Sequence, residues 1–492
     1  MSEREMPVSR VIGKETSDVT HHRLYSQDFL RDIGCNTRRV FHLRCYLAIS
    51  AIPFVNTNIS TIISVDPYRE GMSVKESLFG EIVTIGGRVE SDTRDVTKAL
   101  MKDQDATVVF EDLNGGKAAG NLFSTREKTA AALNVPKEGI VEHLLDAITS
   151  PKQCELVDDP EFRRNSLPVD LMKLPIPKYF PEDGGRYITS GIVVTEYAGK
   201  RNVSFHRMMI MDSGHIAIRL VPRHTFTLYN MAKENGEELK IAICIGARAE
   251  VLLAAATSMD FGADELEVAS AMCLKGHGHP LKVGKCDNGI IVPADTDYVL
   301  EGRITFEQTT EGPFVDITGT YDFERQQPVI AVDKVWTCDD PVFHLLLPGG
   351  NEHYMLMGLP REPMILKTVR QAVPRVKNVR LTEGGCCWLN GVVSIKKNKE
   401  GDGVNAIMAA FTGHPSMKNV IIVDDDIDIF DDRQVEWAVA TRMQGDKILR
   451  IPGAAGSSLD PSSHGKTTWK VGFDATIPVG ADRSLYQKAT LE

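Results

Sequence analysis

The stretch Leu300–Tyr321 reads LEGRITFEQTTEGPFVDITGTY and joins two β-rich runs through a sharp turn. Its acidic residues are Glu301, Glu307, Glu311 and Asp316. Glu311 directly precedes Gly312 and Pro313, and apolar residues follow them. A carboxylate that a tight turn holds among apolar side chains is a candidate for proton transfer. A turn between two half-buried strands explains the same spacing without any chemistry, so spacing alone leaves both interpretations open.

β-rich runs continue on both sides of this stretch, between residue 186 and about residue 330. The sequence predicts strands at Ile188–Glu196, Val203–Met211, His215–Val221, Leu239–Ile245, Ile290–Val292, Tyr298–Phe306 and Phe314–Tyr321. One predicted helix, Glu265–Lys275, interrupts them. Many short strands with one inserted helix are typical of a barrel or split barrel, so residues 186–330 are expected to form a central β domain.

The flanking regions alternate helix and strand. Residues 72–185 are expected to form a small α/β domain that ends in a Pro-rich crossing, and residues 331–492 a second α/β domain. In the latter, helices are predicted at Leu366–Val373 and Asp432–Met443, and strands at Trp388–Lys396 and Asn419–Val423. The expected fold class is therefore mixed α/β (α+β).

Residues 1–71 do not share this patterning. We expect a disordered extension, or a misassigned start with Met72 as the real first residue. Within it, Cys45–Val65 carries no charge and is long enough to cross a bilayer. Pro53 and several Asn, Ser and Thr residues weaken that interpretation, so a membrane span is not favoured.

Length, net charge and cysteine spacing indicate the number of domains, the class of partner and the location to expect. A chain of 492 residues is too long for one ordinary core, so several domains are expected. The net charge of -11 argues against a nucleic-acid partner, because no broad basic face offsets phosphate repulsion. None of the 9 cysteines forms a CxxC pair, and no plausible secretory signal is present, which favours a reducing, cytoplasmic location.

Further polar clusters lie at Asn202–Arg207, Arg219–His224 and Asp264–Glu267, and Arg223 and His224 form the tip of the second. On one continuous strand, Asn202, Ser204 and His206 share a face, and Arg207 points to the other. The Asn, His and Glu side chains of these clusters form a plausible ligand set for Mg²⁺ or Mn²⁺. A capping acid, a loop histidine and a strand asparagine explain the same residues structurally, so the metal interpretation stays open at this point.

The clusters occur in one order with several longer blocks. These are DELEVASAM at Asp264–Met272, LEG at Leu300–Gly302, EGPFVDITGTY at Glu311–Tyr321, VVSIKK at Val392–Lys397, VDDDIDIFD at Val423–Asp431 and WAVATRM at Trp437–Met443. From about Met72 to the C-terminus, this order resembles the UbiD family of prenylated-FMN-dependent decarboxylases. The resemblance implies an N-terminal α/β region, a central split β-barrel similar to flavin reductases that binds the cofactor, and a C-terminal α/β domain that mediates oligomerisation.

The resemblance also implies roles for single residues. Arg207, Glu311 and Asp316 match the catalytic network of the family, with Glu311 as the proton donor. Asn202, His224 and Glu267 match the ligands of a divalent ion, Mn²⁺ or Mg²⁺, that holds the cofactor phosphate. A K⁺ site is implied at Ala256, Thr257 and Met259, and Lys396 matches a lysine that pairs with the same phosphate. The remaining implied cofactor-binding residues are Ser204, Phe205, His206 and Arg223.

The implied activity is that of a carboxy-lyase acting on an α,β-unsaturated acid. GGRYITSGIVV at Gly184–Val194 and PGGNEHYMLMGLPREP at Pro348–Pro363 resemble an archaeal branch that converts trans-anhydromevalonate 5-phosphate to isopentenyl phosphate. His206, Arg223 and His353 are candidates for binding the substrate phosphate.

Other activities on the same scaffold stay open. They are decarboxylation of an aromatic or polyprenyl-hydroxybenzoate acid, non-catalytic flavin binding and ordinary flavin reduction. The implied partners are a flavin prenyltransferase that supplies the cofactor and further copies of the chain, as a dimer or hexamer.

Overall fold

The computed structural model describes residues 80–463 and 467–489. All of these lie in one compact unit, Thr57–Glu492. The predicted N-terminal extension, including Cys45–Val65 and the alternative start at Met72, lies outside the described residues. Among the residues that are described, no helix is both long and apolar enough to cross a membrane.

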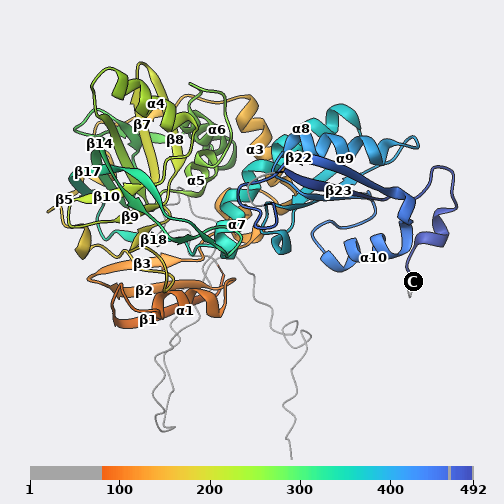
Figure 1. Cartoon of the computed structure of the whole chain (residues 1–492), viewed down its shortest axis with the longest axis horizontal. Helices are drawn as coiled ribbons and strands as arrows, with labels where there is room; N and C mark the ends of the chain where they lie inside the picture. Colours follow the sequence, from red (N-terminus) through yellow and green to blue (C-terminus); the bar gives the residue numbers. More distant parts are fainter. Residues whose placement is uncertain (1–79, 464–466, 490–492) are drawn as a thin grey trace, which may run out of the picture. The chain divides into compact units, whose positions relative to one another are not determined.

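The first sheet brings together distant parts of the sequence. Its order is β1-β2-β3-β18, with β1 at Ile82–Val89, β2 at Thr107–Leu113, β3 at Gly116–Gly120 and β18 at Val342–Leu345. β2 and β3 form a hairpin across Asn114 and Gly115, which both have positive φ as such a tight turn requires. The helices of this part are α1 (Asp95–Lys102), α2 (Arg126–Ala132) and α3 (Ile140–Thr149), and Figure 1 shows α1 beside the sheet.

The central sheet is antiparallel and has 9 strands. Its order is β6 (Tyr187–Ile188), β9 (Met208–Ile210), β10 (His215–Ile218), β17 (Arg325–Thr337), β14 (Tyr298–Glu311), β11 (Leu239–Ile245), β7 (Ile192–Tyr197) and β8 (Lys200–Phe205), and β5 (Asn165–Leu167) pairs with β17. Its helices are α4 (His224–Glu234), α5 (Ala249–Ala255) and α6 (Glu265–His277). Two small sheets accompany it, β13-β12-β4 (Ile291–Pro293, Lys282–Lys285, Glu155–Leu156) and β15-β16 (Phe314–Val315, Tyr321–Asp322).

The predicted strand Val203–Met211 is wrong in one respect. The chain forms β8 up to Phe205 and β9 from Met208, and these two strands pair with different neighbours. His206 and Arg207 lie in the crossing between them, because β8 continues the hairpin with β7 whereas β9 joins β6 and β10. The predicted strand Tyr298–Phe306 is also too short. In the structure, β14 continues to Glu311, and the turn follows it directly.

The last sheet has the order β19-β20-β21-β23-β22. Its strands are β19 (Val376–Leu381), β20 (Asn390–Ile395), β21 (Asn419–Asp424), β22 (Ile448–Ala455) and β23 (Thr467–Ala475). β20, β21 and β23 are parallel, so helices connect them. α8 (Glu362–Ala372) packs against α9 (Asp402–Gly413) and β19, and α9 also packs against β21 and β23 (Figure 1). α7 (Asn351–Gly358) and α10 (Asp432–Arg442) complete the helices named here. The mixed α/β fold class predicted from the sequence is confirmed.

Candidate active site

Arg207 lies in the crossing between β8 and β9, where its side chain is nearly enclosed. Only 9% of that side chain is exposed, and its guanidinium carbon lies 5.0 Å from the centre of the Phe314 ring. Burial alone acts to lower the pKa of Arg207, but its hydrogen bonds and the neighbouring acids raise that pKa above the ordinary value. Arg207 is therefore a permanent cation in a mostly closed environment.

Arg207 contacts three carboxylates. Its Nε donates to Glu311 Oε1 at 2.9 Å, and its Nη2 donates to Glu311 Oε2 at 3.0 Å. Nη1 lies 3.4 Å from Asp316 Oδ2, and Nη2 lies 3.0 Å from Asp322 Oδ2. The structure thus brings together Arg207, Glu311 and Asp316, and it adds Asp322 to them. The two-point contact orients the carboxyl group of Glu311, whose side chain is 0% exposed.

Asp322 was missed by the sequence-based analysis. It lies on β16 directly opposite Phe314 of β15, so its position depends on the pairing of those two short strands. Arg325 binds both of its carboxylate oxygens, at 2.5 and 2.6 Å. Burial acts to raise the pKa of Asp322, but the hydrogen bonds from Arg325 and the charge of Arg207 hold it below the ordinary value. Asp322 is therefore an anion that shares Arg207 with Glu311.

Tyr187 is a second residue that the sequence did not indicate. It is fully buried on β6, and its hydroxyl donates to Glu311 Oε1 at 3.0 Å. Its ring centre lies 4.4 Å from that of Phe314. Burial, followed by the charge of Glu311, raises the pKa of Tyr187, so the hydroxyl keeps its proton and remains a donor. Glu311 is thus held by Arg207 and Tyr187 together.

The turn after Glu311 rests against a glycine from a distant segment. Gly184 donates its backbone N–H to Pro313 O at 2.8 Å, and a Cβ added at Gly184 would overlap the carbonyl oxygen of Gly312. Gly312 itself has a φ of 102°, a conformation that favours glycine. The position of Glu311 at the end of β14 therefore depends on Gly184.

Replacing Gly184 by Ala is expected to displace the Gly312–Pro313 turn and the Glu311 carboxyl with it. A shift of about 1 Å in a reacting group lowers turnover by about 10²-fold, so we expect a loss of that order in kcat. The measurement is steady-state turnover with bound cofactor. Gly86→Ala is the matched control, because its added Cβ would enter open space. Normal turnover in Gly184→Ala would show that the turn tolerates the displacement.

Asp183 lies next to this glycine and makes stability depend on pH. It is 3% exposed, and its Oδ2 accepts the Phe180 N–H at 2.8 Å. Burial raises the pKa of Asp183 to about 6 from 3.8. As pH rises from about 4 to about 6, the unfolded chain loses this proton before the folded one does. Folding stability therefore falls across that window and levels off above it.

Asp183→Asn is expected to remove this loss. Below pH 4, the difference in unfolding free energy between the variant and the parent should not change with pH. By pH 6 to 7, the variant should have gained at most about 3 kcal/mol of unfolding free energy relative to the parent. Urea unfolding at several pH values measures the difference. A difference that does not grow between pH 4 and pH 6 would show that Asp183 titrates as an ordinary exposed acid.

The expected divalent ligands come from three elements. Asn202 lies on β8, His224 is the first residue of α4 and Glu267 lies in the first turn of α6. Both helices contact β8. The Asn202 amide donates its Nδ2 protons to Ser204 Oγ and Thr225 Oγ1, each at 2.8 Å, which leaves its oxygen as the ligating atom. An amide oxygen, an imidazole and a carboxylate are ligand types that suit a hard divalent ion.

The remaining candidates differ in their surroundings. Burial lowers the pKa of His206 to about 4, and its two ring nitrogens lie 2.9 Å from Arg219 O and 3.0 Å from Ser204 Oγ. His206 is therefore a neutral side chain that orders Ser204, which disfavours it as the cation for a substrate phosphate. Ser204 and Phe205 are half-buried on β8. Burial also lowers the pKa of His353, and its Nδ1 accepts the Gly349 N–H at 3.1 Å.

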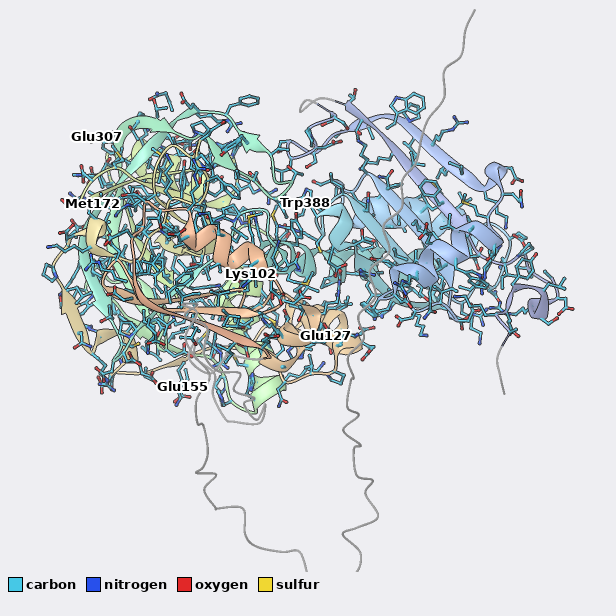
Figure 2. The ribbon with its side chains drawn as sticks, turned by 90° about the horizontal axis from the view of Figure 1, so that it is seen from below. Lys102, Glu127, Glu155, Met172, Glu307 and Trp388 are labelled. Carbon is cyan, nitrogen blue, oxygen red and sulfur yellow. The ribbon has the colours of Figure 1, made fainter. Side chains whose placement is uncertain are left out.

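The expected K⁺ ligands and Lys396 lie in different parts of the chain. Ala256, Thr257 and Met259 directly follow α5, where carbonyl groups at a helix C-terminus suit a cation. Lys396 directly follows β20 and is exposed. Within residues 80–463 and 467–489, no hydrogen bond or ion pair joins the Lys396 side chain to the other candidates. Glu307 is exposed as expected for a solvated acid, and Figure 2 shows it at the margin of the ribbon.

Comparison with known proteins places the chain in a family. Three models described as parts of 3-octaprenyl-4-hydroxybenzoate carboxy-lyase match it, the N-terminal domain at residues 88–148, the Rift-related domain at 155–351 and the C-terminal domain at 354–475. Anhydromevalonate phosphate decarboxylase of Methanocaldococcus jannaschii is 47% identical over 406 residues, which cover 80% of this chain and 94% of that protein. The enzyme of the same name from Methanosarcina mazei is 46% identical over 382 residues, covering 77% and 89%.

A solved structure agrees with these matches. The UbiD-class enzyme HmfF from Pelotomaculum thermopropionicum, in complex with FMN, has a TM-score of 0.81 and 36% identity, covering 85% of this chain and 97% of that chain. An evolved dimeric form of HmfF with prFMN has a TM-score of 0.77 and 34% identity, covering 85% and 97%. The family models together span more than half of the chain, and the matched regions cover most of the length of each relative. This chain belongs to the UbiD family of carboxy-lyases.

Proposed function

We propose that this protein is a prenylated-FMN-dependent decarboxylase that converts trans-anhydromevalonate 5-phosphate to isopentenyl phosphate. The observation that carries the proposal is the fully buried Glu311, held at two points by Arg207 and at a third by Tyr187. The substrate is taken from relatives of 42% to 47% identity that bear the name anhydromevalonate phosphate decarboxylase. HmfF structures with FMN and prFMN support a flavin cofactor.

The chemistry needs one proton at a defined carbon. When CO₂ leaves, its bonding electron pair stays with the substrate, and the carbon that held the carboxylate must then gain a proton. The prenylated flavin supplies an electrophilic centre that accepts this electron density. Glu311 would take up one proton from solvent in each turnover and donate it to that carbon. Arg207 orients both Glu311 and the substrate carboxylate, and Asp316 holds Arg207 through its Nη1.

Electrostatics favour an anionic substrate. Arg219 is half-buried, and burial together with the charges of Arg325 and Arg207 lowers its pKa below the ordinary value. Arg207 pairs with Glu311, Asp316 and Asp322, and Arg325 pairs with Asp322, whereas Arg219 makes no ion pair with an acid within residues 80–463 and 467–489. Arg219 is therefore the cation left for a substrate anion. A doubly charged phosphate ester suits such a site better than a long apolar polyprenyl chain does.

We assign the bound ions to the residues that the family resemblance implies. Asn202, His224 and Glu267 would hold Mn²⁺ or Mg²⁺, and the carbonyls at Ala256, Thr257 and Met259 would hold K⁺. We place the domains at 72–185, 186–330 and 331–492, with the last as the oligomerisation domain of a dimer or hexamer. A flavin prenyltransferase would supply the cofactor, and the proposed location is the cytoplasm.

A substrate panel tests the proposal. The protein is co-expressed with a flavin prenyltransferase, its absorbance spectrum is recorded, and kcat/KM is measured for trans-anhydromevalonate 5-phosphate, an aromatic hydroxy acid and a polyprenyl-hydroxybenzoate. We expect a coloured protein that prefers the phosphate ester by at least about 10³-fold, since Arg219 gains an anionic partner from that substrate and none from the others. Preference for an aromatic acid would contradict the substrate assignment. A flavoprotein that releases CO₂ from none of them would point to non-catalytic flavin binding.

A further inference from the structure

Asp322 lies between two guanidinium groups. Its Oδ2 lies 3.0 Å from Arg207 Nη2 and accepts from Arg325 Nη1 at 2.5 Å, and its Oδ1 accepts from Arg325 Nη2 at 2.6 Å. The backbone N–H of Phe323 also donates to Oδ1, at 2.9 Å. With two cations and a backbone donor around it, and a pKa below the ordinary value, Asp322 is a fixed anion beside Arg207.

Arg325 pairs with Asp322 although it lies across from Glu311. In the pairing of β14 with β17, Arg325 is directly opposite Glu311. Residues of opposite charge at such positions commonly interact with each other. Both Nη atoms of Arg325 instead bind Asp322, and within residues 80–463 and 467–489 no ion pair joins Arg325 to Glu311. In that part of the chain, Arg207 is thus the cation that pairs with Glu311.

The charges of this group do not balance. Arg207 pairs with Glu311, Asp316 and Asp322, and Arg325 pairs with Asp322, so three acids face two cations. A proton on one acid removes the excess negative charge, because neighbouring carboxylates disfavour each other's ionisation. Asp322 stays ionised between its two cations. The side chain of Glu311 is 0% exposed and that of Asp316 is 24% exposed, so water stabilises the ionised form of Glu311 less.

Two other titratable or charged groups act on Glu311. Tyr187 donates its hydroxyl proton to Glu311 from β6, and Arg219, which follows β10, lies within range of its charge. Neither of them contacts Asp322 or Arg325 through a hydrogen bond or an ion pair in the described part of the chain. Changes at Asp322 and Arg325 therefore reach Glu311 through Arg207.

We propose that Asp322 and Arg325 are positioning residues that keep a proton on Glu311 at neutral pH. Asp322 occupies one side of Arg207 and offsets part of its charge, and Arg325 limits how much of that charge Asp322 offsets. The pair thereby sets how strongly Arg207 favours the ionised form of Glu311. The inference rests on the proposed function for the use of this proton at the reacting carbon, but the proton can be followed without turnover.

Infrared difference spectroscopy of the purified full chain follows this proton as pH is varied, because a protonated carboxyl group has a C=O stretch that its ionised form lacks. The band of Glu311 is the one that Glu311→Gln loses. Asp322→Asn is expected to lower the pH at which this band is half lost by at least about 1 pH unit, because Arg207 then acts more fully on Glu311. Arg325→Gln is expected to raise that pH, because the negative charge of Asp322 loses its main counter-charge.

Three further variants sharpen the test. Asp322→Asn combined with Arg325→Gln removes one charge of each sign, so its midpoint should return toward that of the parent. Arg325→Lys keeps the positive charge and should lie between Arg325→Gln and the parent. Lys334→Gln is the matched control: the side chains of Lys334 and Arg325 are both 35% exposed, and Lys334 lies near the other end of β17. Strand geometry separates the two by about 30 Å, so salt screens the charge of Lys334 and no shift is expected.

Unshifted midpoints in both single variants, or shifts in the same direction, would overturn the proposal, since they would indicate a structural role. The proposal would also be wrong if Glu311→Gln lost no band at any pH at which the protein stays folded. In the enzyme loaded with prenylated FMN, the alkaline limb of the kcat profile should move with the infrared midpoint, because only the protonated form of Glu311 can donate. Opposite infrared shifts in a protein that releases no CO₂ would support this inference and contradict the proposed function.

Discussion

Replacing Glu311 by Gln is expected to lower kcat by about 10²- to 10⁴-fold, because the amide cannot deliver the proton that the reacting carbon needs. Gln has nearly the same shape as Glu, and its amide oxygen can still accept from Tyr187 or Arg207. Flavin binding and folding should therefore be retained. The measurement is CO₂ release by the variant loaded with prenylated FMN, at a cofactor content matched to the parent.

Glu307→Gln provides the control for this experiment. Glu307 lies on the same strand, β14, but it is exposed (Figure 2), so we expect parental turnover. If Glu311→Gln with full cofactor content decarboxylates at the parental rate, the proton comes from another group, and the assignment of Glu311 is wrong.

Arg207→Gln is expected to lower both activity and stability. Arg207 contacts Glu311, Asp316 and Asp322, and its removal leaves Glu311 as a buried carboxylate without its two-point cationic partner. Breaking one side of a buried ion pair costs about 3–5 kcal/mol in folding free energy. Turnover should fall with it, because the orientation of Glu311 depends on the same contacts. Urea unfolding at neutral pH and steady-state kinetics measure the two effects.

Arg303→Gln is the matched control for stability. Arg303 lies on β14 and pairs with Glu238 and Asp333, but its side chain is 41% exposed, so its loss should cost less than about 1 kcal/mol. Equal unfolding free energies for the two variants would contradict the view that Arg207 is the buried partner of this acid cluster.

The sequence predicted the residues that carry unusual local patterns. Glu311 was marked by the Gly-Pro turn that follows it, and the mixed α/β class by alternating runs of helix and strand. The order of the blocks then added Arg207 and Asp316. The structure places Arg207 in contact with both Glu311 and Asp316.

Residues that depend on strand pairing were not predictable in this way. Tyr187 looks like an ordinary strand residue, and it reaches Glu311 only because β6 pairs with β9 beside the crossing that holds Arg207. Asp322 reaches Arg207 because the register of β15 and β16 sets it opposite Phe314. The predicted single strand Val203–Met211 failed for a related reason: each half pairs with a different neighbour, and alternation within one segment carries no information about that.

The central claim is that this protein removes CO₂ from an unsaturated acid and that Glu311 protonates the same carbon. The most direct measurement is turnover of trans-anhydromevalonate 5-phosphate by the enzyme loaded with prenylated FMN in D₂O, with CO₂ quantified and the product examined by NMR. We predict isopentenyl phosphate with one deuterium on the carbon that carried the carboxylate, formed in equal amount to CO₂, and formation of both products about 10²- to 10⁴-fold more slowly by Glu311→Gln. Absence of CO₂ release by the loaded parent, or deuterium-labelled product at the parental rate from Glu311→Gln, would contradict the account.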